Sequence, residues 1–143
     1  MKPFNLDSVL KYRHQLENQA QSNFFAAKEQ EALAKKRVQE MVSQYNNLLA
    51  ERDKLQNKAV SIMDVIQLEN KIAHAKQQIS KLKDELQKKA AQSRKAGQQL
   101  VARSRERQAM EKLKEKQNQR WRKYLDKKEA AMLDEIAILK HKK

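Results

Sequence analysis

Residues that commonly carry catalysis or metal binding are few and scattered in this 143-residue sequence. The histidines are His14, His74 and His141, and only His14 has a carboxylate, that of Glu17, on the same helical face. Two ligands do not make a zinc site, which takes three or four. Cysteine is absent, which excludes thiolate ligands, thiolate nucleophiles and disulfides. The sequence therefore predicts no metal and no cofactor.

Nucleotide binding and nucleophilic catalysis are disfavoured in the same way. The only glycine is Gly97, so no glycine-rich loop is present to cradle phosphates. Ser8, Ser61 and the other serines belong to no constellation of histidine and aspartate, and a two-helix rod has no pocket to enclose one. We therefore expect a protein that is not an enzyme.

Positive charge is the strongest chemical signal. The net charge is +14, and residues 88–128 contain 15 basic and four acidic residues. A nucleic-acid site would use these charges with Trp121 and Tyr124 stacking on bases. However, the basic residues surround the predicted helix and acidic residues are interspersed, which favours a solvated helix surface or an acidic protein partner. No nucleic acid is expected, and a membrane-surface helix would need a broader apolar face.

The composition predicts the elements that must position these residues. One glycine, one proline, 5% aromatic and 35% charged residues are typical of long helices or a coiled coil. The start has no apolar run of the kind found in secretory signals. The longest apolar run has four residues, "FFAA", so we expect no transmembrane segment.

Two apolar seams at 3.5-residue spacing indicate coiled-coil packing. The first seam is formed by Ala20, Phe24, Ala27, Glu31, Ala34, Val38, Met41, Tyr45, Leu48, Arg52 and Leu55. The second is formed by Val65, Leu68, Ile72, Ala75, Ile79, Leu82, Leu86, Lys89, Ser93, Ala96 and Leu100.

A helix start separates the two seams. Ser61 and Asp64 have the spacing of a capping box, in which the Ser hydroxyl accepts from a first-turn N–H. Asn57 tolerates the left-handed conformation that ends many helices. The sequence therefore favours a turn near residue 60, with one uninterrupted, dimerising helix as the alternative.

A turn there predicts an antiparallel hairpin in which facing residue numbers sum to about 120. In this register Phe24 faces Ala96, and the opposite charges Glu31 and Lys89, and Glu17 and Arg103, face each other. Arg13 against Arg107 is the misfit. We expect an all-α fold: a long antiparallel two-helix coiled-coil hairpin with the second helix longer. Residues 1–143 form a single unit, with helix 1 at about 5–58, a turn at about 58–62, and helix 2 at about 62–140.

Helix 2 overhangs the hairpin after about residue 117 in this arrangement. The overhang is roughly 25 residues, or on the order of 35 Å if helical. Its apolar stripe has no partner within the chain. The stripe is formed by Trp121, Leu125, Met132, Ile136 and Leu139.

Both ends of the sequence carry recognisable patterns. The start, "FNLDSVLKYRHQLENQAQ", has its pattern at Phe4, Leu6, Val9, Leu10, Arg13, Glu17 and Ala20. The end, "KKEAAMLDEIAILKHKK", has its pattern at Glu129, Leu133, Asp134, Glu135, Ile136 and Ala137. In both patterns the sequence resembles the FliJ family of flagellar type III export proteins. The stalk proteins of virulence-type secretion systems are close relatives and are the alternative family.

The resemblance implies a stalk-like coiled coil of the flagellar export apparatus. Such a protein sits in the pore of the hexameric export ATPase (FliI-like) and promotes its assembly and activity. It also links the ATPase to the export gate protein (FlhA-like) and has been connected with export chaperones. The implied location is the cytoplasm, at the periphery of the membrane-bound apparatus. A basic coiled-coil nucleic-acid-binding protein and a purely structural coiled coil remain the alternatives from other classes.

The resemblance also implies contact residues. ATPase contacts are placed on both chain ends, at Arg13, Glu17, Arg120, Trp121, Arg122, Tyr124, Leu125 and Lys127. Export-gate contacts are placed near the turn, at Met63, Val65, Leu68 and Ile72. Many relatives have an aromatic residue near the start of the second helix, where this sequence has aliphatic residues instead.

Overall fold

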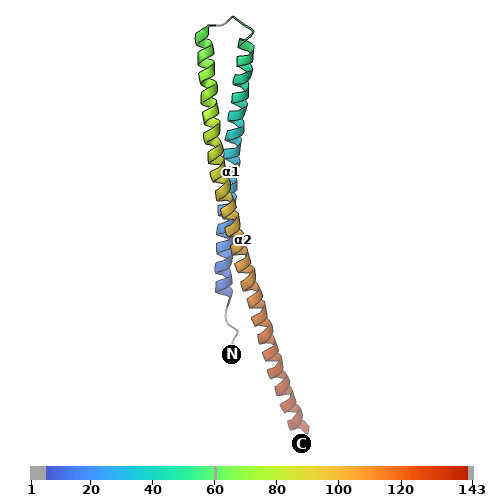
Figure 1. Ribbon diagram of the computed structural model, residues 1–143. Coiled ribbons are helices and arrows are strands. Elements are labelled where there is room, and N and C mark those ends of the chain that lie inside the picture. Colours follow the sequence, from blue (N-terminus) through green and yellow to red (C-terminus); the bar gives the residue numbers. More distant parts are fainter. Residues whose placement is uncertain (1–5, 60, 142–143) are drawn as a thin grey trace. The chain divides into compact units, whose positions relative to one another are not determined.

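The protein is a helical hairpin. The computed structural model describes residues 6–59 and 61–141, and within them it contains two helices and no strand. Helix α1 (Asp7–Leu55) has 49 residues, and helix α2 (Ile62–His141), which runs antiparallel to it, has 80 (Figure 1). The predicted all-α hairpin with a longer second helix is therefore confirmed. Phe4 and the expected helix start at residue 5 lie outside the described residues.

The connection between the helices uses the predicted cap of α2. The backbone N–H of Asp64 donates to the Ser61 hydroxyl at 3.3 Å, as an N-cap requires. The left-handed conformation expected at Asn57 is wrong, because no described residue has a positive φ. Helix α1 instead tightens at its end, where the Asn57 N–H donates to the carbonyl of Lys54 at 3.3 Å. This bond spans three residues and satisfies a terminal carbonyl without a left-handed residue.

Contacts divide the chain into two compact units. One unit comprises Met1–Ala20 and Leu100–Lys143, and the other is Gln21–Gln99. Each unit contains a segment of α1 packed against a segment of α2, so each is described separately.

The unit Gln21–Gln99 has an apolar seam. Every predicted seam position in this unit is buried or half-buried except Val65. Its fully buried apolar residues are Ala34, Leu68, Ile72 and Ala75. Phe24 packs on Gly97, where an added Cβ would lie 3.1 Å from the phenyl ring. Val65 is exposed because it lies level with Leu55, the last residue of α1, so α1 does not continue past it to cover it.

The unit formed by Met1–Ala20 and Leu100–Lys143 has a more polar seam. Leu6 and Ala20 are buried, and Arg107 and Lys114 of α2 occupy half-buried positions between the helices. Where α1 and α2 are joined by ion pairs, in either unit, the paired residue numbers sum to between 119 and 125. The predicted register of about 120 is confirmed.

Two of the predicted charge pairs are wrong in detail. Glu17 pairs with Arg107, one helical turn beyond the expected Arg103. The ion pair of Glu31 is with Lys28 of its own helix, at 3.6 Å, and not with Lys89. Long charged side chains reach residues a turn away from the position directly opposite, so the register alone does not fix their partners.

Candidate protein-binding surfaces

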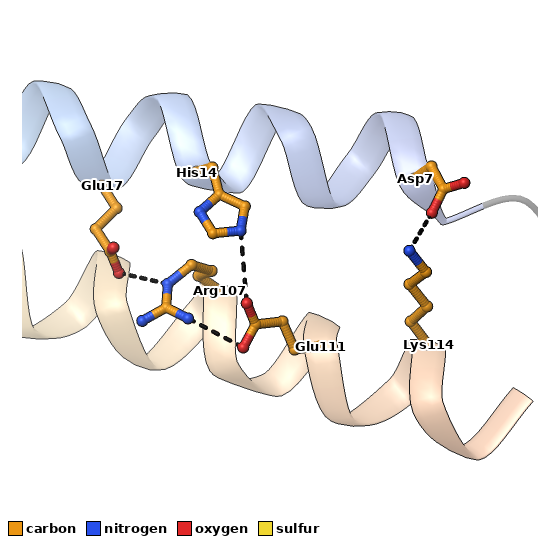
Figure 2. Close-up of polar contacts among 6 residues, drawn as sticks. All are labelled: Asp7, His14, Glu17, Arg107, Glu111 and Lys114. Atoms are coloured by element: carbon orange, nitrogen blue, oxygen red, sulfur yellow. Dashed lines mark hydrogen bonds and ion pairs between the residues drawn. The ribbon is translucent and has the colours of Figure 1, made fainter. Parts of the chain in front are cut away.

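An ion-pair cluster joins the start of α1 to α2. Arg107 lies at its centre: its Nε donates to Glu17 Oε2 at 2.8 Å, and its Nη1 donates to Glu111 Oε2 at 3.0 Å (Figure 2). The other Glu111 oxygen lies 3.5 Å from His14 Nε2. Asp7 pairs with Lys114 at the beginning of α1. Three residues of α1 are thus tied to α2 within the first three helical turns.

Arg13 extends the cluster on the same helix. Its Nη1 donates to Glu106 Oε2 at 3.0 Å, and Arg103 donates to the same oxygen at 3.1 Å. Glu106 therefore lies between two arginines from different helices. This arrangement resolves the misfit expected between Arg13 and Arg107, because each arginine has its own carboxylate.

Glu17 is the most buried carboxylate of the cluster, with 9% of its surface exposed. The hydrogen bond from Arg107 lowers the pKa of Glu17, and the positive charge of that guanidinium acts in the same direction. Burial of the carboxylate opposes this and is the smaller effect. The same hydrogen bond raises the pKa of Arg107. Both groups are therefore charged at neutral pH, and their ion pair links the two helices.

This cluster changes how two predicted ATPase contacts are understood. Arg13 and Glu17 use their charged groups within the chain, so in this conformation neither group is presented outward as a separate charge. Their direct contact with a partner remains a prediction. What the structure assigns to both residues is the attachment of α1 to α2.

The remaining predicted ATPase contacts lie where α2 continues beyond α1. Asp7, the first residue of α1, pairs with Lys114, and α2 runs on to His141. We call residues 118–141 the overhang, the orange and red end of α2 in Figure 1. Every residue from Arg122 to His141 is exposed, and Trp121 is half-buried. The overhang therefore lacks a packing partner among the described residues.

The overhang combines aromatic, apolar and basic side chains. Trp121 and Tyr124 stack with their ring centroids 5.5 Å apart and their planes at 23°. Leu125, Met132, Ile136 and Leu139 are exposed and share the face of Trp121, because they recur every three or four residues. Arg120, Arg122 and Lys127 are exposed around this face. An exposed apolar stripe of this length marks an interaction surface.

The structure brings Arg122 close to the start of α1. A groove of about 370 Å³ is lined by Leu10 of α1 and by α2 residues that include Lys114, Asn118 and Arg122. The base of the overhang and the start of α1 thus form one continuous surface, within one unit. The prediction that both chain ends contribute to one site is consistent with this geometry.

The predicted export-gate contacts do not form one surface. Leu68 and Ile72 are each 7% exposed and pack inside the helix seam. Met63 and Val65 are exposed, and they lie with Ile62 and Ile66 in the first turns of α2. The contact residues predicted from the sequence did not include Ile62 or Ile66. They did include Leu68 and Ile72, although the seam spacing already placed these two residues between the helices. The surface available at this position is therefore formed by Ile62, Met63, Val65 and Ile66.

Other kinds of site find no support in the described residues. No three His, Cys, Asp or Glu side chains of residues 6–59 and 61–141 are grouped as a metal ion would require. Neither described helix has a stretch that is apolar enough, over enough residues, to cross a bilayer.

Comparison with known proteins supports the family resemblance seen at both ends of the sequence. Neither the curated proteins nor the solved structures give a match to the chain. A protein-family model described as "Flagellar FliJ protein" matches residues 1–143, the entire chain. The chain therefore belongs to the FliJ family and is a component of the flagellar export apparatus.

Proposed function

We propose that this protein is the non-enzymatic stalk of the flagellar export ATPase. The overhang of α2 enters the pore of the hexameric ATPase ring, promotes ring assembly and raises the rate of ATP hydrolysis. The exposed first turns of α2 contact the export gate protein, so that the chain links the two. The flagellar family match supports this function over a virulence-system stalk or a nucleic-acid-binding protein.

The observation that carries the proposal is the exposed stripe of the overhang. Leu125, Met132, Ile136 and Leu139 are all more than two-fifths exposed on a helix that has no partner there. Removing such side chains from water is favourable by about 1.5–3 kcal/mol each when they become fully buried. A pore wall with apolar positions would bury them without any rearrangement of the helix.

The positive charge of the overhang also supports the proposed contact with the ATPase ring. Arg120, Arg122, Lys123, Lys127 and Lys128 lie around the first half of the overhang. Acidic residues on the ring wall would pair with them, and such complementarity speeds association and sets orientation more than it raises affinity. The ion-pair cluster contributes indirectly, because it holds the start of α1 beside the base of the overhang.

The gate contact has separate support. Ile62 is 77% exposed, and Met63, Val65 and Ile66 beside it are exposed as well. Four apolar side chains in five residues at a helix start are a small patch suited to a protein partner. Leu68 and Ile72 would support this patch from within the seam.

The test is the rate of ATP hydrolysis by the cognate export ATPase with and without this protein. Replacing both Trp121 and Leu125 with serine should reduce the stimulation at least tenfold, since it removes the first two apolar contacts of the stripe. A matched control replaces Phe25 and Leu33, two exposed apolar residues of α1, with serine. The control should stimulate as the unmodified protein does, and circular dichroism should show the same helicity for all three. Full stimulation by the Trp121/Leu125 variant would contradict the proposal.

A further inference from the structure

The overhang also has the features of a surface that pairs with a second copy of itself. Its two halves carry opposite charge. Residues 118–128 contain five basic residues and one acidic residue, whereas residues 129–141 contain three acidic residues and one lysine, Lys140, beside His141. The acidic residues are Glu129, Asp134 and Glu135, and all three are exposed.

We infer that two copies of this protein associate through their overhangs, packed antiparallel. In that orientation the basic half of each helix lies beside the acidic half of the other. A parallel arrangement would instead place the two basic halves side by side, where like charges repel. The charge distribution therefore selects the orientation.

The apolar stripe is compatible with this symmetry. An interface with a two-fold axis uses the same surface of both copies, so each contact occurs twice. With the axis near residue 129, Trp121 of one copy lies level with Ile136 of the second, and Leu125 lies level with Met132. Four of the five stripe residues then lie level with an apolar residue, while Leu139 lies level with Asn118. The stripe that α1 leaves uncovered thus becomes a helix–helix seam.

The overhang is long enough for this pairing. From Asn118 to His141 it has 24 residues, roughly 36 Å of helix. Two helices of this length with three-to-four-residue apolar spacing resemble a short coiled coil. Because the stripe is interrupted by charged residues, we expect a dissociation constant in the micromolar range and not a permanent dimer.

Self-association would use the same face as the proposed ATPase contact. The face can serve one partner at a time, so a dimer would keep the stripe out of water until a ring captures it. The inference does not depend on the ATPase, however, because it follows from the charge and apolar pattern of this chain alone. Its test uses the isolated full-length protein.

Sedimentation equilibrium across protein concentrations of about 1–300 μM measures the association directly. We expect the mass to rise from the monomer value of 16.8 kDa towards twice that value. Replacing Met132 and Ile136 with serine should weaken association at least tenfold. A matched control replaces Leu133 and Ile138, two exposed apolar residues off the stripe, and should change it less than threefold.

A charge exchange tests whether charge pairing between the overhangs drives the association. The variant Arg122→Glu/Lys123→Glu/Lys127→Glu has an acidic overhang, and the variant Glu129→Lys/Asp134→Lys/Glu135→Lys has a basic one. Each alone should remain monomeric at about 0.1 M salt, while an equimolar mixture should form a heterodimer. An unmodified protein that is monomeric at every concentration would overturn the inference, as would equal association of the stripe and control variants. Association of each charge variant alone would overturn the charge pairing.

Discussion

At the scale of single residues, Glu17 and Arg107 show how a polar seam is kept together. Both are placed between the helices, and their 2.8 Å hydrogen bond joins two groups that hold their charges at neutral pH. A neighbouring carboxylate, Glu111, shares the guanidinium. Breaking such a pair on one side leaves a partly buried charge without its partner, which is unfavourable. The start of α1 therefore depends on Glu17 as much as on its few apolar contacts.

Replacing Glu17 with glutamine should make the melting temperature less sensitive to pH. The pKa of Glu17 is lower in the folded protein than the ordinary value of roughly 4.3. Its contribution to the free energy of unfolding is therefore present above that ordinary value and is lost as the pH falls through the folded-state pKa. Thermal unfolding followed by circular dichroism at pH 7 and pH 3 measures the effect.

The unmodified protein should lose more melting temperature between these two pH values than the Glu17→Gln variant does. Replacing Glu29, an exposed glutamate of α1, with glutamine provides the matched control. That control should behave as the unmodified protein. An equal loss of melting temperature in the Glu17 variant would show that its ion pair contributes nothing measurable.

At the scale of helices, most of the architecture could be predicted from the sequence. Every position that the 3.5-residue spacing assigned to the two seams is buried or half-buried except Val65, and the Ser61 hydroxyl caps α2 as expected. Spacing succeeds here because burial in a two-helix coil depends almost entirely on which side of the helix a residue occupies. Val65 failed because spacing does not say where the partner helix ends.

Side-chain partners could not be predicted to the same extent. Glu17 had two arginines within reach on α2, Arg103 and Arg107, one helical turn apart. The choice depends on Glu106 and Glu111, which also compete for those arginines. Two of the four predicted gate contacts, Leu68 and Ile72, are buried in the seam, where their spacing had already placed them. The gate contact itself remains a prediction.

The cap of α2 gives a prediction at this scale. Replacing Ser61 with alanine removes the acceptor of the Asp64 N–H and should lower the free energy of unfolding by about 1 kcal/mol. Replacing Ser43, which is exposed in the interior of α1, with alanine should instead raise it by a few tenths of a kcal/mol, because alanine has the higher helix propensity. Urea unfolding of both variants measures the two changes. The same sign of change in both would contradict the capping role.

At the scale of the whole molecule, the residues that pair the two helices are different from the residues that are exposed to partners. The seams bury the residues that hold α1 against α2. Exposed apolar residues gather in the first turns of α2 and in its overhang, while single ones such as Phe25 are exposed along α1. Two separate surfaces suit a protein that links two components of the export apparatus, and the net charge of +14 favours partners with acidic surfaces.

The central claim is that the overhang contacts the export ATPase directly, and site-specific photo-crosslinking tests it. A photoreactive amino acid replaces Leu125 in one variant and Phe25, a more exposed position on α1, in another. Each variant is mixed with the cognate ATPase under conditions that permit hexamer formation, and the adducts are identified by mass spectrometry. The account predicts that the Leu125 variant forms an adduct with residues that line the ATPase pore, whereas the Phe25 variant forms little or none. A Leu125 variant that forms no adduct with an ATPase it still stimulates would contradict the account.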